Sequence, residues 1–102
     1  MFGGVIMHFH YYLGNTSYND GHRHRYQGMT SIDNDVPGHV HEMAGITSFE
    51  DGHTHNYKSV TGPAIYANGM HYHMYRGETS VADRHIHNYD GNTSFNFNNG
   101  WY

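Results

Sequence analysis

The sequence has little of what usually holds a small domain together. Cysteine is absent, only two of the 102 residues are proline, and leucine, isoleucine, valine and phenylalanine together make up 16 residues. The lack of cysteine excludes disulfides, and the shortage of large apolar side chains excludes an ordinary core. Small domains with a poor core usually depend on disulfides, on bound metal or on self-association. For this chain, metal and self-association remain as sources of cohesion.

Charge and long apolar runs are also scarce. Five lysines and arginines stand against nine aspartates and glutamates, for a net charge of −4. This balance argues against nucleic acid as the main partner, because binding to phosphates needs clustered positive charge. No apolar run approaches the length of about 18 residues that a membrane span requires. We therefore expect neither nucleic acid nor a membrane as a partner.

The chain is rich in histidine and tyrosine instead. It contains twelve histidines and ten tyrosines, and such an aromatic content is typical of an ordered chain. Every histidine belongs to a His-x-His pair, whose two imidazoles point to the same side of an extended strand. Six pairs that use up all histidines favour metal binding, because imidazole nitrogen is a common metal ligand. The pairs are His8/His10, His22/His24, His39/His41, His53/His55, His71/His73 and His85/His87.

The histidine pairs open a repeated unit of ten residues. Its pattern is H-x-H-x-Y-x-G-x-T-S, and six copies begin at residues 8, 22, 39, 53, 71 and 85. The spacing between copies alternates between 14 and 17–18 residues, which makes a pair of units the true module. We therefore expect a single domain over residues 1–102, built from three modules at approximately 8–38, 39–70 and 71–102.

The unit predicts β-structure rather than helix. Its repeated residues recur with a period of two, and turn signals such as Asp20-Gly21, Asp51-Gly52 and Asn68-Gly69 separate the copies. We expect an all-β fold of six strands, each about eight to ten residues long. The six strands are expected to form a small antiparallel closed barrel or meander. The alternative is a parallel β-solenoid with one module per turn of the coil.

The repeated residues share one parity, which predicts the packed face of each strand. The histidines, tyrosine, glycine and threonine of a unit point the same way, and the variable, mostly polar residues point the other way. We expect each tyrosine ring to lie over the bare backbone of a glycine in a neighbouring strand. The Thr-Ser pairs are expected to hydrogen-bond the turns.

Both predicted folds collect the histidine pairs into the same two sets. Antiparallel strands place successive pairs at opposite ends of the sheet, and a solenoid stacks odd units on odd units and even on even. In a barrel, each layer is expected to place three imidazoles around a cation at about 2.0–2.1 Å, as in zinc sites. The layers of the first set are His8/His39/His71 and His10/His41/His73, and those of the second are His22/His53/His85 and His24/His55/His87.

All twelve histidines are therefore candidate metal ligands. Imidazole suits copper, zinc and nickel, and we expect copper or zinc first, with nickel as a further candidate. No carboxylate or cysteine repeats with the histidines, which disfavours hard ions such as calcium and magnesium. The alternative is a metal-free polar core in which the imidazoles hydrogen-bond tyrosine hydroxyls or the backbone.

No residue of the sequence is assigned to catalysis. A catalytic site normally adds one distinct base or nucleophile to its metal ligands. Asp20, Asp51 and Asp83 recur at the turns and are interpreted as turn formers. We therefore expect a protein that binds transition metal for a structural purpose, for storage or for transport, and not an enzyme.

Self-assembly into a filament or another homo-oligomer is the alternative function. The repeats have no clear polar caps, and their ends are apolar, with Phe2, Val5 and Ile6 at the N-terminus and the segment FNFNNGWY at the C-terminus. Either terminal segment is expected to dock on a second copy, and the alternative for the C-terminal one is that it caps an open end. The first seven residues, MFGGVIM, lack the basic region of a secretory signal. We therefore expect a cytoplasmic location by default, and an extracellular one if filaments form.

The repeat resembles a known family. The stretch that begins DGHTHNY and runs to TGPAI (51–65), followed by GMHYHMYRGETS (69–80), is similar to the YmaF family of small bacterial histidine-rich repeat proteins. The same motif recurs from residue 8 to residue 94, so that the resemblance covers nearly the whole chain. The resemblance implies a repeat protein and names no reaction.

Overall fold

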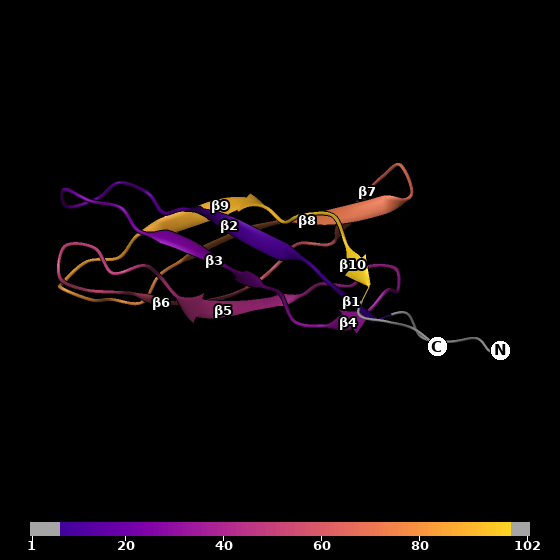
Figure 1. The fold of residues 1–102 in the computed structure, drawn as a ribbon, viewed down its shortest axis with the longest axis horizontal. Helices are drawn as coiled ribbons and strands as arrows, with labels where there is room; N and C mark the ends of the chain where they lie inside the picture. The colour runs from indigo at the N-terminus through magenta and orange to yellow at the C-terminus, as the bar shows by residue number, and fades with distance from the viewer. Residues whose placement is uncertain (1–6, 99–102) are drawn as a thin grey trace.

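The computed structural model describes residues 7–98, and this part of the chain is all-β, as predicted. Ten strands and no helix occur in it (Figure 1). Within the described part, no helix has the length and apolarity that crossing a membrane requires. The strands are β1 (Met7–Phe9), β2 (Tyr11–Asn15), β3 (Arg25–Met29), β4 (Asp33–Asn34), β5 (Glu42–Ile46), β6 (Asn56–Val60), β7 (Ala64–Ala67), β8 (Met70–Glu78), β9 (Asn88–Asn92) and β10 (Phe97–Asn98).

The strands form four small antiparallel sheets. Three of them contain the hairpins β2-β3, β5-β6 and β8-β9, which pair in equivalent registers. β7 extends the third hairpin by pairing with β8, and β1 lies between β10 and β4 in the fourth sheet. Among the residues described, strand pairing closes into neither a barrel nor a solenoid, so that both arrangements stay predictions.

Most strands are shorter than predicted. We expected about eight to ten residues, but five of the six hairpin strands have five residues and only β8 has nine. The strands cover the tyrosine and glycine of each unit, and most histidine pairs lie beside them. At the histidine pairs, threonine side chains take the place of some backbone carbonyls as hydrogen-bond acceptors. The backbone N–H of His24, for example, donates to Oγ1 of Thr16 at 3.0 Å, while the carbonyl of His24 accepts from the Thr16 N–H at 2.8 Å.

Tight turns close all three hairpins, and two of these turns lie where the Asp-Gly signals predicted them. Asp20 and Gly21 have φ values of 55° and 84°, and Asp51 and Gly52 have 51° and 85°. Two successive positive φ values are the signature of a type I′ turn, which matches the twist of the flanking strands. The third hairpin has an arginine at the second turn position, Arg84, with a φ of 66°.

Backbone hydrogen bonds link each hairpin to both of the others. At every junction, residues that follow the threonine of one hairpin donate to carbonyls of the next hairpin, at 2.7–2.9 Å. The contacts join β3 to β5, β6 to β8 and β9 to β2. The donor and acceptor pairs are Ser31 and Glu42, Ser48 and Arg25, Gly62 and Met74, Ser80 and Asn56, Ser94 and Tyr11, and Ser17 and Asn88.

The apolar core is a band of tyrosines in the middle of the hairpins. Each tyrosine stands opposite a glycine, as Tyr26 does opposite Gly14. A Cβ atom added at Gly14 would lie 2.5 Å from the Tyr26 hydroxyl, which confirms that the ring covers bare backbone. The buried residues of this band are Tyr12, Tyr26, Met43, Tyr57, Tyr75 and Tyr89.

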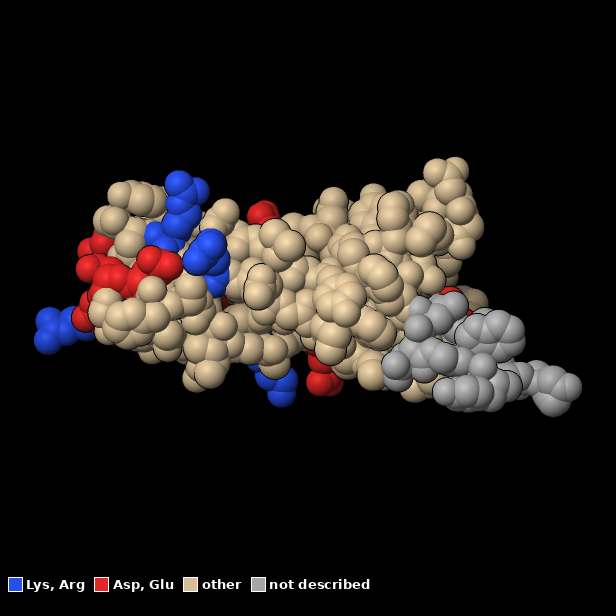
Figure 2. All heavy atoms as spheres, viewed as in Figure 1, with Lys and Arg blue, Asp and Glu red and all other residues tan. Residues whose placement is uncertain are grey.

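The two ends of the molecule differ in surface charge. Figure 2 shows that charged side chains gather at the hairpin tips, at the left of the view, whereas most of the remaining face is uncharged. The outward faces are less polar than predicted, since Leu13 on β2 is 75% exposed and Ile46 on β5 is 65% exposed. Of the apolar ends named above, Phe2, Val5, Ile6 and Trp101 lie outside the described residues.

Candidate metal centre

The structure brings the twelve histidines together in the two predicted sets. In each set, one ring nitrogen per histidine lies within 4.8 Å of the corresponding nitrogen of every other member. We name them the base cluster, near β1 and β10, and the tip cluster, beside the hairpin turns. The base cluster is His8, His10, His39, His41, His71 and His73, and the tip cluster is His22, His24, His53, His55, His85 and His87.

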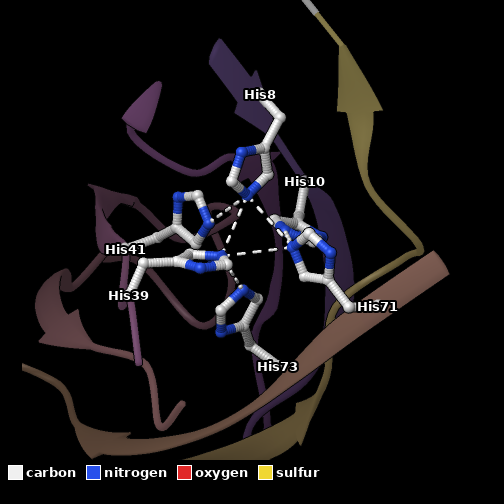
Figure 3. A group of neighbouring side chains, drawn as sticks. All are labelled: His8, His10, His39, His41, His71 and His73. Atoms are coloured by element: carbon white, nitrogen blue, oxygen red, sulfur yellow. Dashed lines mark hydrogen bonds between the residues drawn. The ribbon is translucent and has the colours of Figure 1, made fainter. Parts of the chain in front are cut away.

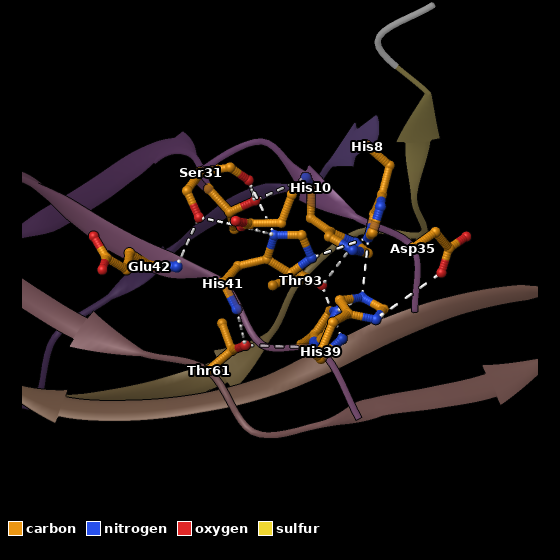
Figure 4. Close-up of polar contacts among 12 residues, drawn as sticks. His8, His10, Ser31, Asp35, His39, His41, Glu42, Thr61 and Thr93 are labelled. Atoms are coloured by element: carbon orange, nitrogen blue, oxygen red, sulfur yellow. Dashed lines mark hydrogen bonds and ion pairs between the residues drawn. The ribbon is translucent and has the colours of Figure 1, made fainter. Parts of the chain in front are cut away.

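The threonine of each unit holds the second histidine of a partner unit in place. Its Oγ1 accepts the backbone N–H of that histidine, and the distance is 3.0 Å in all six cases. Figure 4 shows this contact between Thr61 and His41. We expected both residues of each Thr-Ser pair to hydrogen-bond the turns. Only the serine does so, as when the Ser48 hydroxyl donates to the carboxylate of Glu50. The threonine side chains bind the histidine backbone instead, because the N–H groups there have no carbonyl partner in a strand ladder.

We call the first histidine of each pair the outer one and the second the inner one. The inner histidine is oriented by a carbonyl of the neighbouring hairpin. The Nδ1–H group donates to a backbone oxygen at 2.8–3.0 Å. Since a carbonyl only accepts, Nδ1 must carry the proton, which leaves the Nε2 lone pair free. The pairs are His10 and Ser94, His24 and Ser48, His41 and Ser31, His55 and Ser80, His73 and Gly62, and His87 and Ser17.

Four of the outer histidines have the same tautomer. The Nδ1 of His39 donates to the carbonyl of Val36 at 2.7 Å. In the three outer histidines of the tip cluster, Nδ1 donates to the backbone carbonyl of the aspartate two residues earlier, at 3.0–3.2 Å. These pairs are His22 and Asp20, His53 and Asp51, and His85 and Asp83. Ten of the twelve rings therefore keep the proton on Nδ1 and present Nε2 to the cluster.

The Nε2 atoms of the base cluster converge on one point (Figure 3). Those of His8, His39 and His71 form a triangle with sides of 3.0, 3.0 and 3.2 Å. The Nε2 atom of each of these three histidines also lies 3.0–3.2 Å from the Nε2 atom of one inner histidine. These contacts are His71 with His10, His8 with His41, and His39 with His73. Because most of these rings hold their proton on Nδ1, lone pairs face lone pairs, which is repulsive unless a cation lies among them.

This arrangement corrects the predicted site with three histidines. The layer of His8, His39 and His71 exists, but it shares its centre with the layer of His10, His41 and His73 (Figure 3). Two predicted layers thus merge into one set of six donors. The reason is that neighbouring residues of one parity along an extended chain are close enough for their long side chains to meet at the axis.

Burial lowers the pKa of eight of the twelve imidazoles and keeps these eight uncharged at neutral pH. Desolvation, together with the neighbouring imidazoles, lowers the pKa of His8 and His73 to about 4 and that of His10 to about 3. In the tip cluster, burial likewise lowers the pKa values of His24, His55 and His87. The lone pairs are consequently available for coordination without competition from protons.

Aspartates surround the tip cluster in a cyclic order that we did not predict from the sequence. The carboxylate of Asp51 lies 3.3 Å from Nδ1 of His22, in the preceding hairpin. Asp83 stands in the same relation to His53 at 3.8 Å, and Asp20 to His85 at 3.5 Å. We had interpreted these aspartates as turn formers, and they also place a carboxylate beside a histidine of another hairpin. The constant Asp-x-His spacing was the signal for this second role.

The base cluster has its own acidic neighbours. The carboxylate of Asp33 lies 3.0 Å from Nδ1 of His41. The carboxylate of Asp35 lies 3.9 Å from Nδ1 of His39, as Figure 4 shows. Carboxylates behind metal-binding imidazoles fix the ring orientation and raise the basicity of the ligand. Both clusters therefore have the outer groups that metal-bound histidines usually have.

Fold and site together define a small all-β histidine-rich repeat protein with two buried polyimidazole clusters. The chain belongs to the YmaF family, whose sequence model, described as "Spore germination protein GerY/YamF", matches residues 31–95. No curated protein and no solved structure matches the chain.

Proposed function

We propose that this protein binds transition-metal ions, one in each histidine cluster, for a structural purpose, for storage or for transport. The proposal depends on one observation, that the Nε2 lone pairs of each cluster converge while the Nδ1 protons are donated to carbonyls. Copper, zinc and nickel ions all accept imidazole ligands. A binding role fits better than a catalytic one, because six imidazoles would leave no open position for a substrate.

Metal-free packing of the same rings is the less favourable alternative. A buried polar atom without a hydrogen-bond partner costs about 1–3 kcal/mol. Ten of the twelve rings leave such a nitrogen, and together these would cost about 10–30 kcal/mol, as much as or more than the roughly 5–15 kcal/mol that stabilises a typical domain. A cation at each centre removes this cost by giving every lone pair an acceptor.

We also propose that the three hairpins close into a barrel-like ring around the axis through both clusters. The hydrogen bonds at all three junctions support this arrangement, and so does the cyclic order of the aspartates. The ring gives each cluster equal contributions from the three modules. Metal at the axis would then stabilise the ring by holding the hairpins together.

Elemental analysis of purified protein tests the metal-binding proposal. We expect about two equivalents of transition metal per chain, and a loss of β-sheet circular dichroism or of thermal stability after chelation. Changing His24, His55 and His87 to glutamine should remove one equivalent. The matched control changes Arg23, Thr54 and Ile86, which lie between the histidines of the same pairs. Protein that contains no metal and keeps its stability in chelator would contradict the proposal.

Self-assembly remains a second candidate because the outward faces carry large apolar side chains. Leu13, Phe49 and Val81 are each at least 70% exposed. At the base end, the rings of Phe9 and Phe97 stack with centroids 5.9 Å apart, and Phe97 also meets Tyr11 edge-on. Such surfaces favour contact with a second copy. Sedimentation at high concentration, with and without metal, tests this candidate, and a monodisperse monomer in both conditions would contradict it.

A further inference from the structure

The rings of the base cluster are arranged as the corners of an octahedron. Each imidazole lies edge-on to every other ring of the cluster except one, with centroids 4.6–5.3 Å apart. The one ring that an imidazole does not meet edge-on lies opposite it, on the other side of the cluster centre. His8 and His73 are opposite in this sense in Figure 3. The three opposite pairs are His8/His73, His10/His39 and His41/His71.

The nitrogen positions have the dimensions of a metal coordination sphere. Six of the twelve edges, each joining two Nε2 atoms, measure 3.0–3.2 Å. Dividing by the square root of two gives the distance from corner to centre, about 2.1–2.3 Å, slightly longer than the roughly 2.0–2.1 Å of four-coordinate zinc–histidine bonds. Longer bonds are expected when six ligands share one ion.

The tip cluster repeats this arrangement with its own residues. Its neighbouring rings have centroids 4.7–5.0 Å apart. Again, every ring lacks one neighbour, the opposite one. The opposite pairs are His22/His55, His24/His85 and His53/His87. Two independent sets of residues therefore reach the same geometry.

From this geometry, and resting on the proposed function, we infer that each cluster is an octahedral site of six imidazoles that binds nickel(II) or iron(II) in preference to zinc(II). Imidazole suits both ions. Zinc in proteins is almost always four-coordinate, so that it would leave two imidazoles without an acceptor.

The three-fold relation of the modules also acts against copper(II). Copper(II) favours a tetragonal environment, in which one axis differs from the other two. Here every axis joins the first histidine of one module to the second histidine of another, so that the three axes are equivalent. Lengthening one axis would require one module to differ from the other two, against the threonine and carbonyl contacts that hold all three alike.

Cobalt(II) spectroscopy and X-ray absorption on reloaded full-length protein test the coordination number. We expect the weak visible bands of octahedral cobalt(II), and six nitrogen neighbours in the nickel-loaded protein. Dialysis against equimolar nickel(II) and zinc(II) should leave at least about tenfold more nickel than zinc on the protein, equivalent to about 1.4 kcal/mol. Intense tetrahedral cobalt bands, or four nitrogen neighbours, would overturn the inference while leaving metal binding intact. Protein that binds none of these ions would overturn the proposed function itself.

A pair of adjacent single variants gives a second, independent readout. His24→Gln removes one corner of the tip octahedron, whereas Arg23→Gln changes an exposed neighbour that points away from it. We expect His24→Gln to weaken one of the two nickel equivalents by tenfold or more and Arg23→Gln to change neither. Equal nickel affinity for the two variants would contradict a six-histidine site, and the unchanged base cluster reports whether His24→Gln still folds.

Discussion

At the scale of single residues, the most informative position is the one where the repeat departs from its pattern. Met43 replaces the tyrosine of the third unit, and Ser59 replaces the glycine opposite it. The hydroxyls of the other tyrosines pair across hairpins at 2.9 Å, as Tyr12 does with Tyr57. The partner expected for Tyr89 is residue 43, which is methionine, so the buried Tyr89 hydroxyl lacks the tyrosine partner that the other four have. The two departures compensate each other, because Ser59 fills the space that a tyrosine ring needs.

A double-mutant cycle tests this compensation. Met43→Tyr alone should destabilise the protein by about 1–3 kcal/mol, because the new ring meets the Ser59 side chain. Adding Ser59→Gly should restore the stability and supply Tyr89 with a hydroxyl partner worth about 1 kcal/mol. Urea denaturation of the wild type, both single variants and the double variant measures the coupling. Strictly additive effects would show that the two positions do not interact.

The buried histidines predict how stability depends on pH. Their pKa values are about 3 for His10 and about 4 for His8 and His73, whereas the unfolded chain titrates near 6.5. Between these values the unfolded state binds more protons, so the free energy of unfolding of metal-free protein should fall as the pH drops from 6.5 toward 4. The slope is up to about 1.4 kcal/mol per pH unit for each histidine. Above pH 6.5 their contribution is constant. Denaturation curves at a series of pH values check this, and a flat profile between pH 7 and 4.5 would contradict it.

At the scale of elements, each hairpin fixes the position and direction of its histidines. Its short strands pack tyrosine on glycine, and the segments beyond them turn their backbone toward threonine side chains. Thr30 is typical, since its Oγ1 accepts the N–H of His10 at 3.0 Å and its own N–H donates to the carbonyl of His10 at 2.8 Å. The histidine is thereby fixed at its backbone before any metal binds, as a preorganised site requires.

Replacing Thr30 by valine should therefore act on both stability and metal binding. The variant keeps the shape but leaves the His10 N–H without a partner, at a cost of about 1–3 kcal/mol. Thr30→Ser keeps the hydroxyl and is the matched control. Thermal melts and nickel titrations of both variants measure the effect, which should fall on the base cluster and spare the tip cluster. A Thr30→Val variant as stable as Thr30→Ser would show that the hydroxyl is not needed.

At the scale of the whole molecule, the two clusters differ in access to solvent. All six histidines of the base cluster are buried, whereas the side chains of His53 and His85 in the tip cluster are each 12% exposed. The tip cluster lies at the charged end of the molecule, and its three aspartate carboxylates are 61–65% exposed (Figure 2). Access to the base cluster is further limited by the sheet of β10, β1 and β4 (Figure 1).

This difference predicts that a chelator removes the two ions at different rates. The tip ion should leave first, because its outer ligands open to solvent without separating the hairpins. Asp20→Asn, Asp51→Asn and Asp83→Asn together should speed only this faster phase, since asparagine keeps the turn conformation and removes the carboxylates. Stopped-flow mixing of nickel-loaded protein with chelator resolves the phases. A single phase, unchanged by the triple variant, would contradict the assignment.

Much of the fold and of the site follows from local pattern. The period of two placed His22, His24 and Tyr26 on one face, and the Asp-Gly signals located the turns at Asp20 and Asp51, because side-chain direction and turn type depend on neighbouring residues alone. The predicted strand length was wrong because it depends on more than the local pattern. The pattern cannot tell whether an extended segment bonds a strand or, like His24, a threonine side chain.

Membership of the two histidine sets was determined by the sequence, because alternating connectors send odd and even units to opposite ends in either predicted fold. That six imidazoles share one centre was decided only by the tertiary structure. Their orientation depends on carbonyls far away in the chain, such as that of Ser94 for His10 and that of Ser17 for His87. No local rule connects residues separated by most of the chain, and only the packing of the three hairpins brings their atoms within hydrogen-bonding distance.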